Sequence, residues 1–523
     1  MQKVTYASLG TLGEEFHREF EVAAERFHHQ LGRTYPMFIG GKAWKKKQKV
    51  FVDVNPSDTR VILGKFPEGT SHDARRAIAA ARAAFPSWKA TDWQQRVVLL
   101  RKAADLIAQH QMEFAVLLSM ETGKNRFEAI AEVSETVDLI LYYCRQMEEH
   151  RGYFMTMQET GSEQTRSILK PYGVWVVIVP FNFPMALGVG MATGALVAGN
   201  TVVFKPASDA PLIGLRIYEM LHGAGLTDGV FNFVTGAGRE LGKEFLGNPD
   251  VDGLAFTGSR AVGMNFLRRF RGKYQRPCII EMGGKNPTIV MPSAHLDDAT
   301  EGIFRSAFGM GGQKCSACSR LYLHHDIYAS SMELLVEKTK KCRIGNALAR
   351  ETFLGPLING KAVQTYQRAI LRGRKEGHVV TGGAILKEGD FAHGYFVEPT
   401  IIDQLLKKSI MFQEEYFVPI LAVAEVRSLE EAITLANQSD YGLTAGIFTE
   451  DKKEQQTFFE KIEAGVAYSN RRGGATTGAW PGVQSFGGWK GSGSTGKNGL
   501  GPYYVSQFMR EQSQTVAQKL YSR

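Results

Sequence analysis

Residues 171–204 read PYGVWVVIVPFNFPMALGVGMATGALVAGNTVVF, and no charged side chain occurs in this stretch. Its length alone would suit a membrane-spanning helix. Pro180, Pro184 and several glycines interrupt the run, however, and they separate an apolar strand at 174–179 from a small-residue helix and a second strand at 201–204. Two buried strands joined by a helix form a parallel βαβ unit, so the stretch predicts an α/β fold and no membrane partner.

The alternation of strands and helices continues outward from this unit as far as residue 283, as is typical of a doubly wound, Rossmann-type cofactor domain. It resumes after Asn286 and predicts a second α/β domain. The chain of 523 residues is too long for one hydrophobic core, which also indicates at least two domains. We assign residues 1–152 and 172–283 to the cofactor domain and residues 284–491 to the second domain.

Local signals predict three helices before the βαβ unit. Thr70 and Asp73 match a capping box that begins one helix, and we expect this helix to end before Pro86. Apolar periodicity predicts two more helices, at residues 93–109 and 127–146. A β-hairpin around residues 35–55 is expected to precede them.

Composition and charge exclude several classes of function. The net charge is +9, but the lysines and arginines are scattered and their densest run, at residues 45–49, is short, which favours a solvated surface over a nucleic-acid site. The N-terminus has acidic residues and no apolar core, so we expect a cytoplasmic protein without a secretory signal. Five cysteines without framework spacing predict reduced thiols.

Two glycine-rich motifs carry the residues most suited to covalent chemistry. Glu281 begins EMGGKNP and Cys315 lies in GMGGQKCSACSR. A thiol can hold an acyl group as a thioester, and a carboxylate can activate the water that removes it. The pair therefore predicts nucleophilic catalysis on a carbonyl group.

These motifs resemble the catalytic core of the aldehyde dehydrogenase superfamily, and the resemblance extends from YPMFIGG at Tyr35 to the tail near Met509. It implies a Rossmann-type cofactor domain, a second α/β catalytic domain and a β-arm, with NAD or NADP as the cofactor. The arm and tail, at residues 153–171 and 503–523, would pair subunits into a homo-oligomer, with an exposed strand at 503–514.

The resemblance also implies catalytic roles for three residues. Cys315 would attack an aldehyde carbon, and Asn182, in VPFNFP, would stabilise the resulting oxyanion together with the Cys315 backbone N–H. Glu281 would activate the water that hydrolyses the thioester.

Cofactor-binding residues follow from further matched motifs. FTGSRAVG, at residues 256–263, follows an apolar stretch and begins an expected helix, so its N–H groups can meet a pyrophosphate. The resemblance implies cofactor contacts from Pro180, Phe181, Lys205, Ser208, Gly258, Ser259, Glu415 and Phe417. Ser208 stands where NAD-preferring relatives often carry glutamate, which predicts that NADP is accepted; a neutral surface change with NAD still preferred is the alternative.

Within the superfamily, the chain looks most like the L-glutamate γ-semialdehyde (1-pyrroline-5-carboxylate) dehydrogenases, which finish proline breakdown to glutamate. In that group the serine after the nucleophile and a late glycine-rich loop bind the α-carboxylate, and aromatic rings flank the stem. The matching residues here are Ser316, Gly478, Ala479, Phe183 and Phe486. An NADP-linked dehydrogenase for another carboxylate-bearing aldehyde, such as succinic semialdehyde, is the neighbouring alternative. A cofactor-free thiol hydrolase is an alternative from another class, but it leaves the cofactor motifs unexplained.

Two further patterns match known binding motifs, and we interpret neither as a binding site. GSGSTGK, at residues 491–497, satisfies phosphate-loop spacing, but no buried strand is expected before it and Asn498 replaces the magnesium-binding hydroxyl. Cys315 and Cys318 form a CxxC without a second pair of ligands, so we predict no metal site. A reversible disulfide between these two cysteines is an open hypothesis.

Overall fold

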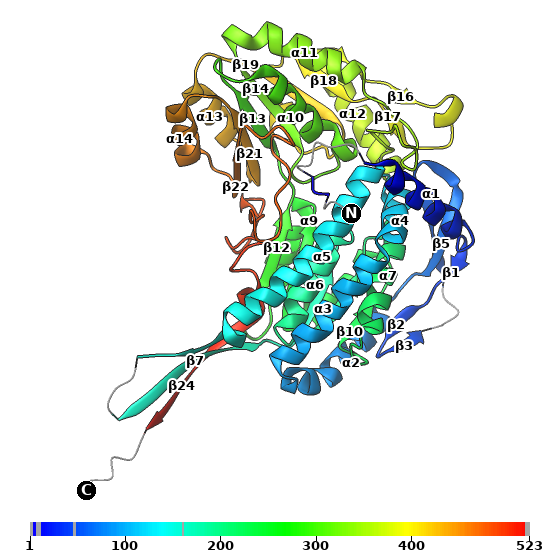
Figure 1. Cartoon of the computed structure of the whole chain (residues 1–523), viewed down its shortest axis with the longest axis vertical. Helices are drawn as coiled ribbons and strands as arrows, with labels where there is room; N and C mark the ends of the chain where they lie inside the picture. Colours follow the sequence, from blue (N-terminus) through cyan, green and yellow to red (C-terminus); the bar gives the residue numbers. More distant parts are fainter. Residues whose placement is uncertain (1–3, 7–11, 45–48, 159–161, 518–523) are drawn as a thin grey trace.

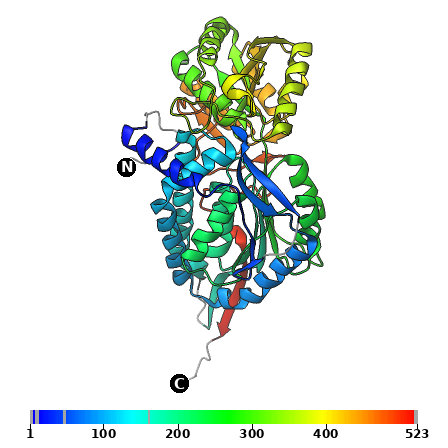
Figure 2. The same cartoon turned by 90° about the vertical axis from the view of Figure 1, so that its right-hand side faces the viewer.

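The computed structural model describes residues 4–6, 12–44, 49–158 and 162–517, so most of the predicted lysine run lies outside the described residues. Two lobes, each built on a seven-stranded sheet, are stacked along the long axis, and a narrow arm projects from the lower lobe (Figures 1 and 2). The predicted α/β class, with a β-arm, is confirmed. Among the described residues, no helix has both the length and the apolar character that a membrane crossing needs.

The lower sheet has the strand order β12-β11-β8-β9-β10-β2-β3. Its strands are β2 (Met37–Ile39), β3 (Lys42–Trp44), β8 (Val174–Ile178), β9 (Thr201–Lys205), β10 (Phe231–Phe233), β11 (Gly253–Gly258) and β12 (Cys278–Met282). The five strands from β8 to β12 are parallel, and β2 joins β10 antiparallel. The chain runs outward from β8 through β9 to β10 and then crosses back to β11, so the strand order reverses between β8 and β11. Open α/β sheets bind ligands at such a reversal.

The stretch that predicted the fold forms the centre of this sheet. β8 and β9 pair in parallel, and α6 (Ala186–Val197) connects them. Every residue of β9, and every residue of α6 except Leu187, is buried. The apolar run interrupted by Pro180 and Pro184 therefore forms two central strands and a buried helix of the lower lobe. It does not form a membrane-spanning helix.

Helices cover both faces of the lower sheet (Figure 1). The helices of this lobe are α1 (Glu14–His28), α2 (Ser71–Ala90), α3 (Trp93–Gln109), α4 (Gln111–Thr122), α5 (Arg126–Glu149), α6, α7 (Pro211–Gly223), α8 (Gly238–Gly247) and α9 (Arg260–Arg269), and α1 packs on α4 rather than on the sheet. The predicted helix at 93–109 is confirmed, and the one at 127–146 is confirmed with slightly wider bounds. α4 was not predicted because it is buried all round from Phe114 to Thr122, which removes the amphipathic period.

The predicted end of α2 before Pro86 is wrong. The capping box of Thr70 and Asp73 is present, but the helix continues through Pro86 to Ala90. The extra turn buries Trp88, whose indole N–H donates to the Leu196 carbonyl at 3.2 Å. Burial of this large side chain offsets the hydrogen bond that proline removes.

The upper sheet has the order β15-β18-β19-β14-β13-β21-β22 and is parallel except for the edge strand β15. Its strands are β13 (Asn286–Val290), β14 (Cys318–His324), β15 (His378–Thr381), β18 (Thr400–Asp403), β19 (Ile420–Val426), β21 (Thr444–Phe448) and β22 (Val466–Ser469). Its helices are α10 (Leu296–Phe308), α11 (Tyr328–Lys340), α12 (Gly360–Glu376), α13 (Leu429–Asn437) and α14 (Lys452–Lys461). The predicted boundary at 283/284 falls between β12 and β13; the domain limits themselves stay a prediction.

The smaller sheets complete the chain and correct two expectations. They contain β1 (Arg33–Thr34), β4 (Val50–Asn55), β5 (Asp58–Pro67), β6 (Phe154–Thr156), β7 (Glu163–Pro171), β16 (Ile385–Leu386), β17 (Phe396–Val397), β20 (Tyr441–Gly442), β23 (Trp489–Lys490) and β24 (Met509–Ala517). The predicted hairpin is only β2–β3, because β4 pairs with β5 instead. The tail strand begins at Met509 rather than residue 503, because Tyr504 and Phe508 are buried in the core just before it. β24 pairs with β7 along the arm.

Candidate active site

Cys315 and Glu281 line one cavity of about 540 Å³. Glu281 lies near the carboxyl end of β12 in the lower sheet, and Cys315 lies on the loop that leads into β14 in the upper sheet. The two predicted motifs, one from each lobe, therefore meet at a shared solvent space. A thiol and a carboxylate in one cavity suit covalent catalysis followed by hydrolysis.

The loop before Cys315 needs its glycines. Gly311 and Gly312 both have φ of +63°, in the left-handed region. A Cβ at Gly312 would lie 2.6 Å from the backbone oxygen of Val418, which cannot move away easily. The glycine-rich sequence thus lets the nucleophile loop turn tightly against the chain that leads into β19.

Asn286 fixes the same loop from the other side, and the sequence reasoning assigned it no role. Its side-chain N–H₂ donates to the backbone oxygens of Cys315 at 2.7 Å and Ala317 at 2.9 Å. Its side-chain oxygen accepts from the Thr444 N–H at 3.1 Å. Because all three bonds are buried, Asn286 positions the nucleophile loop between β13 and β21. Its position in EMGGKNP, five residues after Glu281, was the feature of the sequence that could have indicated a role in the site.

The cavity raises the pKa of both reactive groups. Burial, with a further contribution from the charges of Glu281 and Glu415, raises the pKa of the Cys315 thiol well above its usual value. Burial, followed by the nearby charge of Glu135, raises the pKa of Glu281 to about 8. The thiol is therefore neutral at pH 7, and Glu281 gains its charge only in mildly alkaline solution.

Asn182 lies in the turn between β8 and α6 and is buried. Its backbone oxygen accepts from the ammonium group of Lys124, which is fully buried and forms a 2.9 Å ion pair with Glu132. Glu132 in turn accepts from the backbone N–H of Met185 at 2.9 Å. This buried pair, which the sequence reasoning missed, holds the turn that carries Asn182 and Phe183. The oxyanion role of Asn182 stays a prediction.

All five predicted substrate residues line the cavity: Phe183, Ser316, Gly478, Ala479 and Phe486. Gly478 has φ of +103°, and its carbonyl oxygen accepts from Arg471 at 2.5 Å. This contact turns the carbonyl of Gly478 toward Arg471. The structure thus brings together the residues predicted for carboxylate binding, beside Cys315.

Glu135, on α5, also lines the cavity and was not predicted. Its carboxylate accepts from the Tyr6 hydroxyl at 2.9 Å. Burial raises the pKa of Glu135 to about 8, while the Tyr6 hydrogen bond opposes this rise. A buried carboxylate beside a solvent space is suited to an ammonium group, because a bound cation would favour its charged form. No sequence motif marked it, since it lies in the middle of a long helix.

The predicted cofactor residues of the lower sheet lie at adjacent strand ends. Pro180 follows β8, Lys205 ends β9 and Gly258 ends β11, and the strand register places these ends along one edge. Ser259 caps α9 without a side-chain hydrogen bond to its first turn. The first N–H groups of this ten-residue helix therefore point to an edge suited to a pyrophosphate.

Glu415, Phe417 and Phe181 lie beside this edge. Glu415 accepts from the Gly284 N–H at 2.9 Å, and burial raises its pKa to about 7. Phe181 and Phe417 meet edge to face with centroids 5.9 Å apart. Phe417 adopts a positive φ of 58°, in the left-handed region. Contacts of these residues with the nicotinamide end of a dinucleotide stay a prediction.

The sequence pattern of the aldehyde dehydrogenase family matches residues 44–514. The chain belongs to this family. It is 36% identical over 513 residues to a 1-pyrroline-5-carboxylate dehydrogenase of Bacillus licheniformis, covering 97% of both chains. The solved Thermus 1-pyrroline-5-carboxylate dehydrogenase with bound NAD is 34% identical, with a TM-score of 0.92 and 97% of each chain covered. An Escherichia coli NADP-dependent enzyme is 30% identical, with a TM-score of 0.87 and coverage of 92% of this chain and 98% of that one.

Family membership makes this protein an NAD(P)-dependent aldehyde dehydrogenase, and its two lobes match the family fold. The Lys205 ammonium donates to the Pro206 carbonyl at 2.9 Å, and burial lowers its pKa to about 8. Its contact to the adenosine ribose stays a prediction. Ser208 is exposed, three residues beyond Lys205. A role of Ser208 in the choice between NAD and NADP stays a prediction.

Replacing Ser208 by glutamate is expected to lower kcat/KM for NADP by about tenfold or more, with NAD affected less than threefold. The new carboxylate would repel a 2′-phosphate but can accept from ribose hydroxyls. Steady-state kinetics with both cofactors checks this, and Ser208→Gln is the size-matched neutral control. An NADP-to-NAD ratio that stays the same in Ser208→Glu would show that Ser208 does not face the 2′ position.

The two remaining patterns lie in different settings: residues 493–497 of GSGSTGK line the cavity, whereas Cys318 does not. β23, just before Gly491, is an exposed two-residue strand, as the phosphate-loop argument expected. The Cys318 thiol donates to the Thr288 hydroxyl at 3.2 Å and to the Arg320 carbonyl at 3.5 Å, in the core rather than on the cavity wall. These contacts hold Cys318 away from the solvent space, so the disulfide hypothesis gains no support from them.

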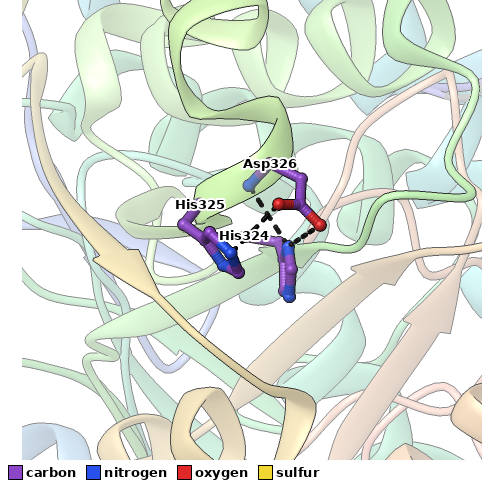
Figure 3. Close-up of side chains that lie close together, drawn as sticks. All are labelled: His324, His325 and Asp326. Atoms are coloured by element: carbon purple, nitrogen blue, oxygen red, sulfur yellow. Dashed lines mark hydrogen bonds and ion pairs between the residues drawn. The ribbon is translucent and has the colours of Figure 1, made fainter.

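His324, His325 and Asp326 are the one group of possible metal ligands within reach of each other in the described part of the chain (Figure 3). His324 uses its Nε2 for the Arg427 carbonyl at 3.0 Å, and its Nδ1 accepts from the Asp326 N–H at 3.3 Å. His325 pairs with the Asp326 carboxylate at 3.0 Å. Local hydrogen bonds thus account for this turn at the end of β14, which is not part of the cavity wall.

Proposed function

We propose that this protein oxidises L-glutamate γ-semialdehyde, the open form of 1-pyrroline-5-carboxylate, to L-glutamate with NAD or NADP. The observation that carries the proposal is the single cavity that combines Cys315 and Glu281 with Ser316, the 478–479 backbone and Glu135. Such a cavity offers one group for each part of the substrate: the aldehyde, the α-carboxylate and the α-ammonium. The function of the closely related dehydrogenases, named for 1-pyrroline-5-carboxylate, agrees with it.

The two ends of the substrate explain the polar groups of the cavity. The Ser316 hydroxyl and the backbone N–H groups of the Gly478 loop are fixed donors for an α-carboxylate. Glu135 supplies a buried carboxylate for the α-ammonium, and Phe183 and Phe486 pack along the aliphatic stem. An aldehyde that lacks the ammonium would leave Glu135 without its partner, so the site is expected to discriminate against succinic semialdehyde.

The chain's own groups then perform the covalent steps. Cys315 gives its thiol proton to solvent water and its sulfur bonds to the aldehyde carbon, while Asn182 and the Cys315 backbone N–H stabilise the oxyanion. When bound, NAD or NADP supplies the hydride acceptor that turns this adduct into a thioester. Glu281 takes a proton from the attacking water, the carbon–sulfur bond breaks, and the proton passes from Glu281 to the Cys315 thiolate as L-glutamate leaves.

A steady-state assay of the purified protein tests the proposal by following reduced cofactor with each aldehyde and each cofactor. We expect kcat/KM for 1-pyrroline-5-carboxylate to exceed that for succinic semialdehyde by at least about a hundredfold, from lost pairing of buried charges. A preference for succinic semialdehyde would reject the substrate but keep the thioester chemistry. Ester cleavage without any cofactor dependence would favour the thiol hydrolase instead.

We further propose that the arm joins copies of this chain. β6, β7 and β24 project from the lower lobe, with β24 at one edge of this three-stranded sheet (Figure 1). An exposed strand edge is suited to pairing with another chain.

The five free cysteines support our prediction of a reducing, cytoplasmic compartment.

A further inference from the structure

Tyr6, from the N-terminal segment, lies in the wall of the active-site cavity. Its ring packs edge to face against Phe183 and against Trp480, with both centroid distances 5.8 Å. Its hydroxyl donates to the Glu135 carboxylate at 2.9 Å. A residue far outside the catalytic motifs thus touches both the aromatic wall and the acidic group of the substrate site.

The first helix of the chain, α1, is packed firmly into the lower lobe. It follows Tyr6 in the chain and packs beside α4, with Phe16, Phe20 and Phe27 buried in the core of the lower lobe (Figure 1). α1 is therefore anchored in the lower lobe through its apolar face.

Ion pairs add a second anchor at the mouth of the cavity. Arg350 contacts Glu14 and Glu21, both at 2.8 Å, and Arg126 contacts Glu21 at 3.2 Å. Arg126, Arg350 and Glu14 also line the cavity. Leu12, Glu14 and His17 line the same cavity as Tyr6, so the start of α1 borders the solvent space that Tyr6 enters.

The Tyr6 hydroxyl has a specific effect on Glu135. Among the described residues, the Tyr6 hydroxyl is the side-chain group that donates a hydrogen bond to the Glu135 carboxylate. A fixed phenol donor orients one carboxylate oxygen and leaves the other for a cationic ligand. Burial and the nearby charge of Glu135 raise the pKa of Tyr6, so the phenol stays protonated and keeps donating.

We infer that Tyr6 is a specificity-determining residue of this aldehyde dehydrogenase. It orients Glu135 toward the α-ammonium of the substrate, and its ring closes the cavity beside Phe183 and Trp480 to bulkier aldehydes. The role in ammonium recognition rests on the proposed function. The role of the ring as a wall does not depend on which aldehyde is the natural substrate.

The orienting role is tested with Tyr6→Phe and two matched ligands. L-Glutamate carries the ammonium, whereas glutarate has the same chain and carboxylates without it. Calorimetry is expected to show that Tyr6→Phe weakens L-glutamate binding about tenfold while glutarate changes less than twofold, as expected for loss of a hydrogen bond to a charged group. Tyr35→Phe is the matched control, since the Tyr35 hydroxyl donates to the Gln30 carbonyl at 3.3 Å and lies outside the cavity wall.

The closing role is tested with Tyr6→Ala and straight-chain aldehydes. We expect kcat/KM for octanal to rise about tenfold relative to butanal, because removing the ring enlarges the cavity. Melting temperatures of both variants should stay within a few degrees of the parent, since α1 keeps its own anchors. Unchanged ligand preference in Tyr6→Phe together with unchanged aldehyde preference in Tyr6→Ala would overturn the inference. A parent protein that fails to oxidise 1-pyrroline-5-carboxylate would instead contradict the proposed function.

Discussion

Replacing Cys315 by alanine is expected to lower kcat for aldehyde oxidation by at least about 10⁴-fold, because no other nucleophile could carry the thioester. Among the described cysteines, Cys315 is the one that lines the cavity. Burial keeps its pKa well above the usual value, so the unliganded protein stores a neutral thiol. Purified protein, assayed with and without substrate, gives the rate, and a cofactor titration checks that the variant still binds NAD or NADP.

Cys318→Ala is the matched control for this prediction. Cys318 is buried three residues away, and its thiol bonds to Thr288 and Arg320 inside the upper lobe. Its loss is expected to change kcat by less than about threefold, since it does not reach the reacting carbon. Measurable turnover in Cys315→Ala, above roughly one percent of the parent, would contradict the covalent mechanism, because a removed nucleophile costs far more.

The parts of the site that depend on local motifs could be predicted from the sequence. The uncharged stretch at 171–204 predicted a βαβ unit because its prolines and glycines break it at fixed points. The ends of β8, β9 and β11 then had to share one edge, which is a property of any parallel sheet. The structure brings Cys315, Ser316 and Glu281 to one cavity because their glycine-rich motifs form the loops at the junction of the two sheets.

Other parts of the site depend on contacts between distant segments, which no single motif encodes. Lys124 and Glu132 lie on a buried stretch without a distinctive pattern, yet they hold the Asn182 turn. Glu135 is part of the site because α5 passes the cavity. Tyr6 is part of the site because its ring lies in the cavity wall, far from Glu135 in sequence. The continuation of α2 through Pro86 has the same origin, because it is packing of Trp88 that outweighs the local signal.

Glu281→Gln is expected to lower the steady-state rate about 10²- to 10⁴-fold while leaving the first turnover of reduced cofactor visible. Glutamine keeps the shape of the side chain but cannot take a proton from water. Cys315 could still form the thioester once, so the variant should release about one equivalent of reduced cofactor per site and then stall. Stopped-flow absorbance records this burst, and mass spectrometry of the quenched protein detects the acyl group on Cys315.

A pH profile of the rate tests whether Glu281 is the base. Burial and the charge of Glu135 raise the pKa of Glu281 to about 8, so its active, deprotonated form accumulates as the pH rises through 8. The parent rate of thioester hydrolysis should therefore increase from pH 7 to pH 9, and this increase should disappear in Glu281→Gln. Glu135→Gln removes the neighbouring charge, so it should move the midpoint to lower pH at saturating substrate. A parent profile that is flat between pH 7 and pH 9, or that survives in Glu281→Gln, would assign water activation to another group.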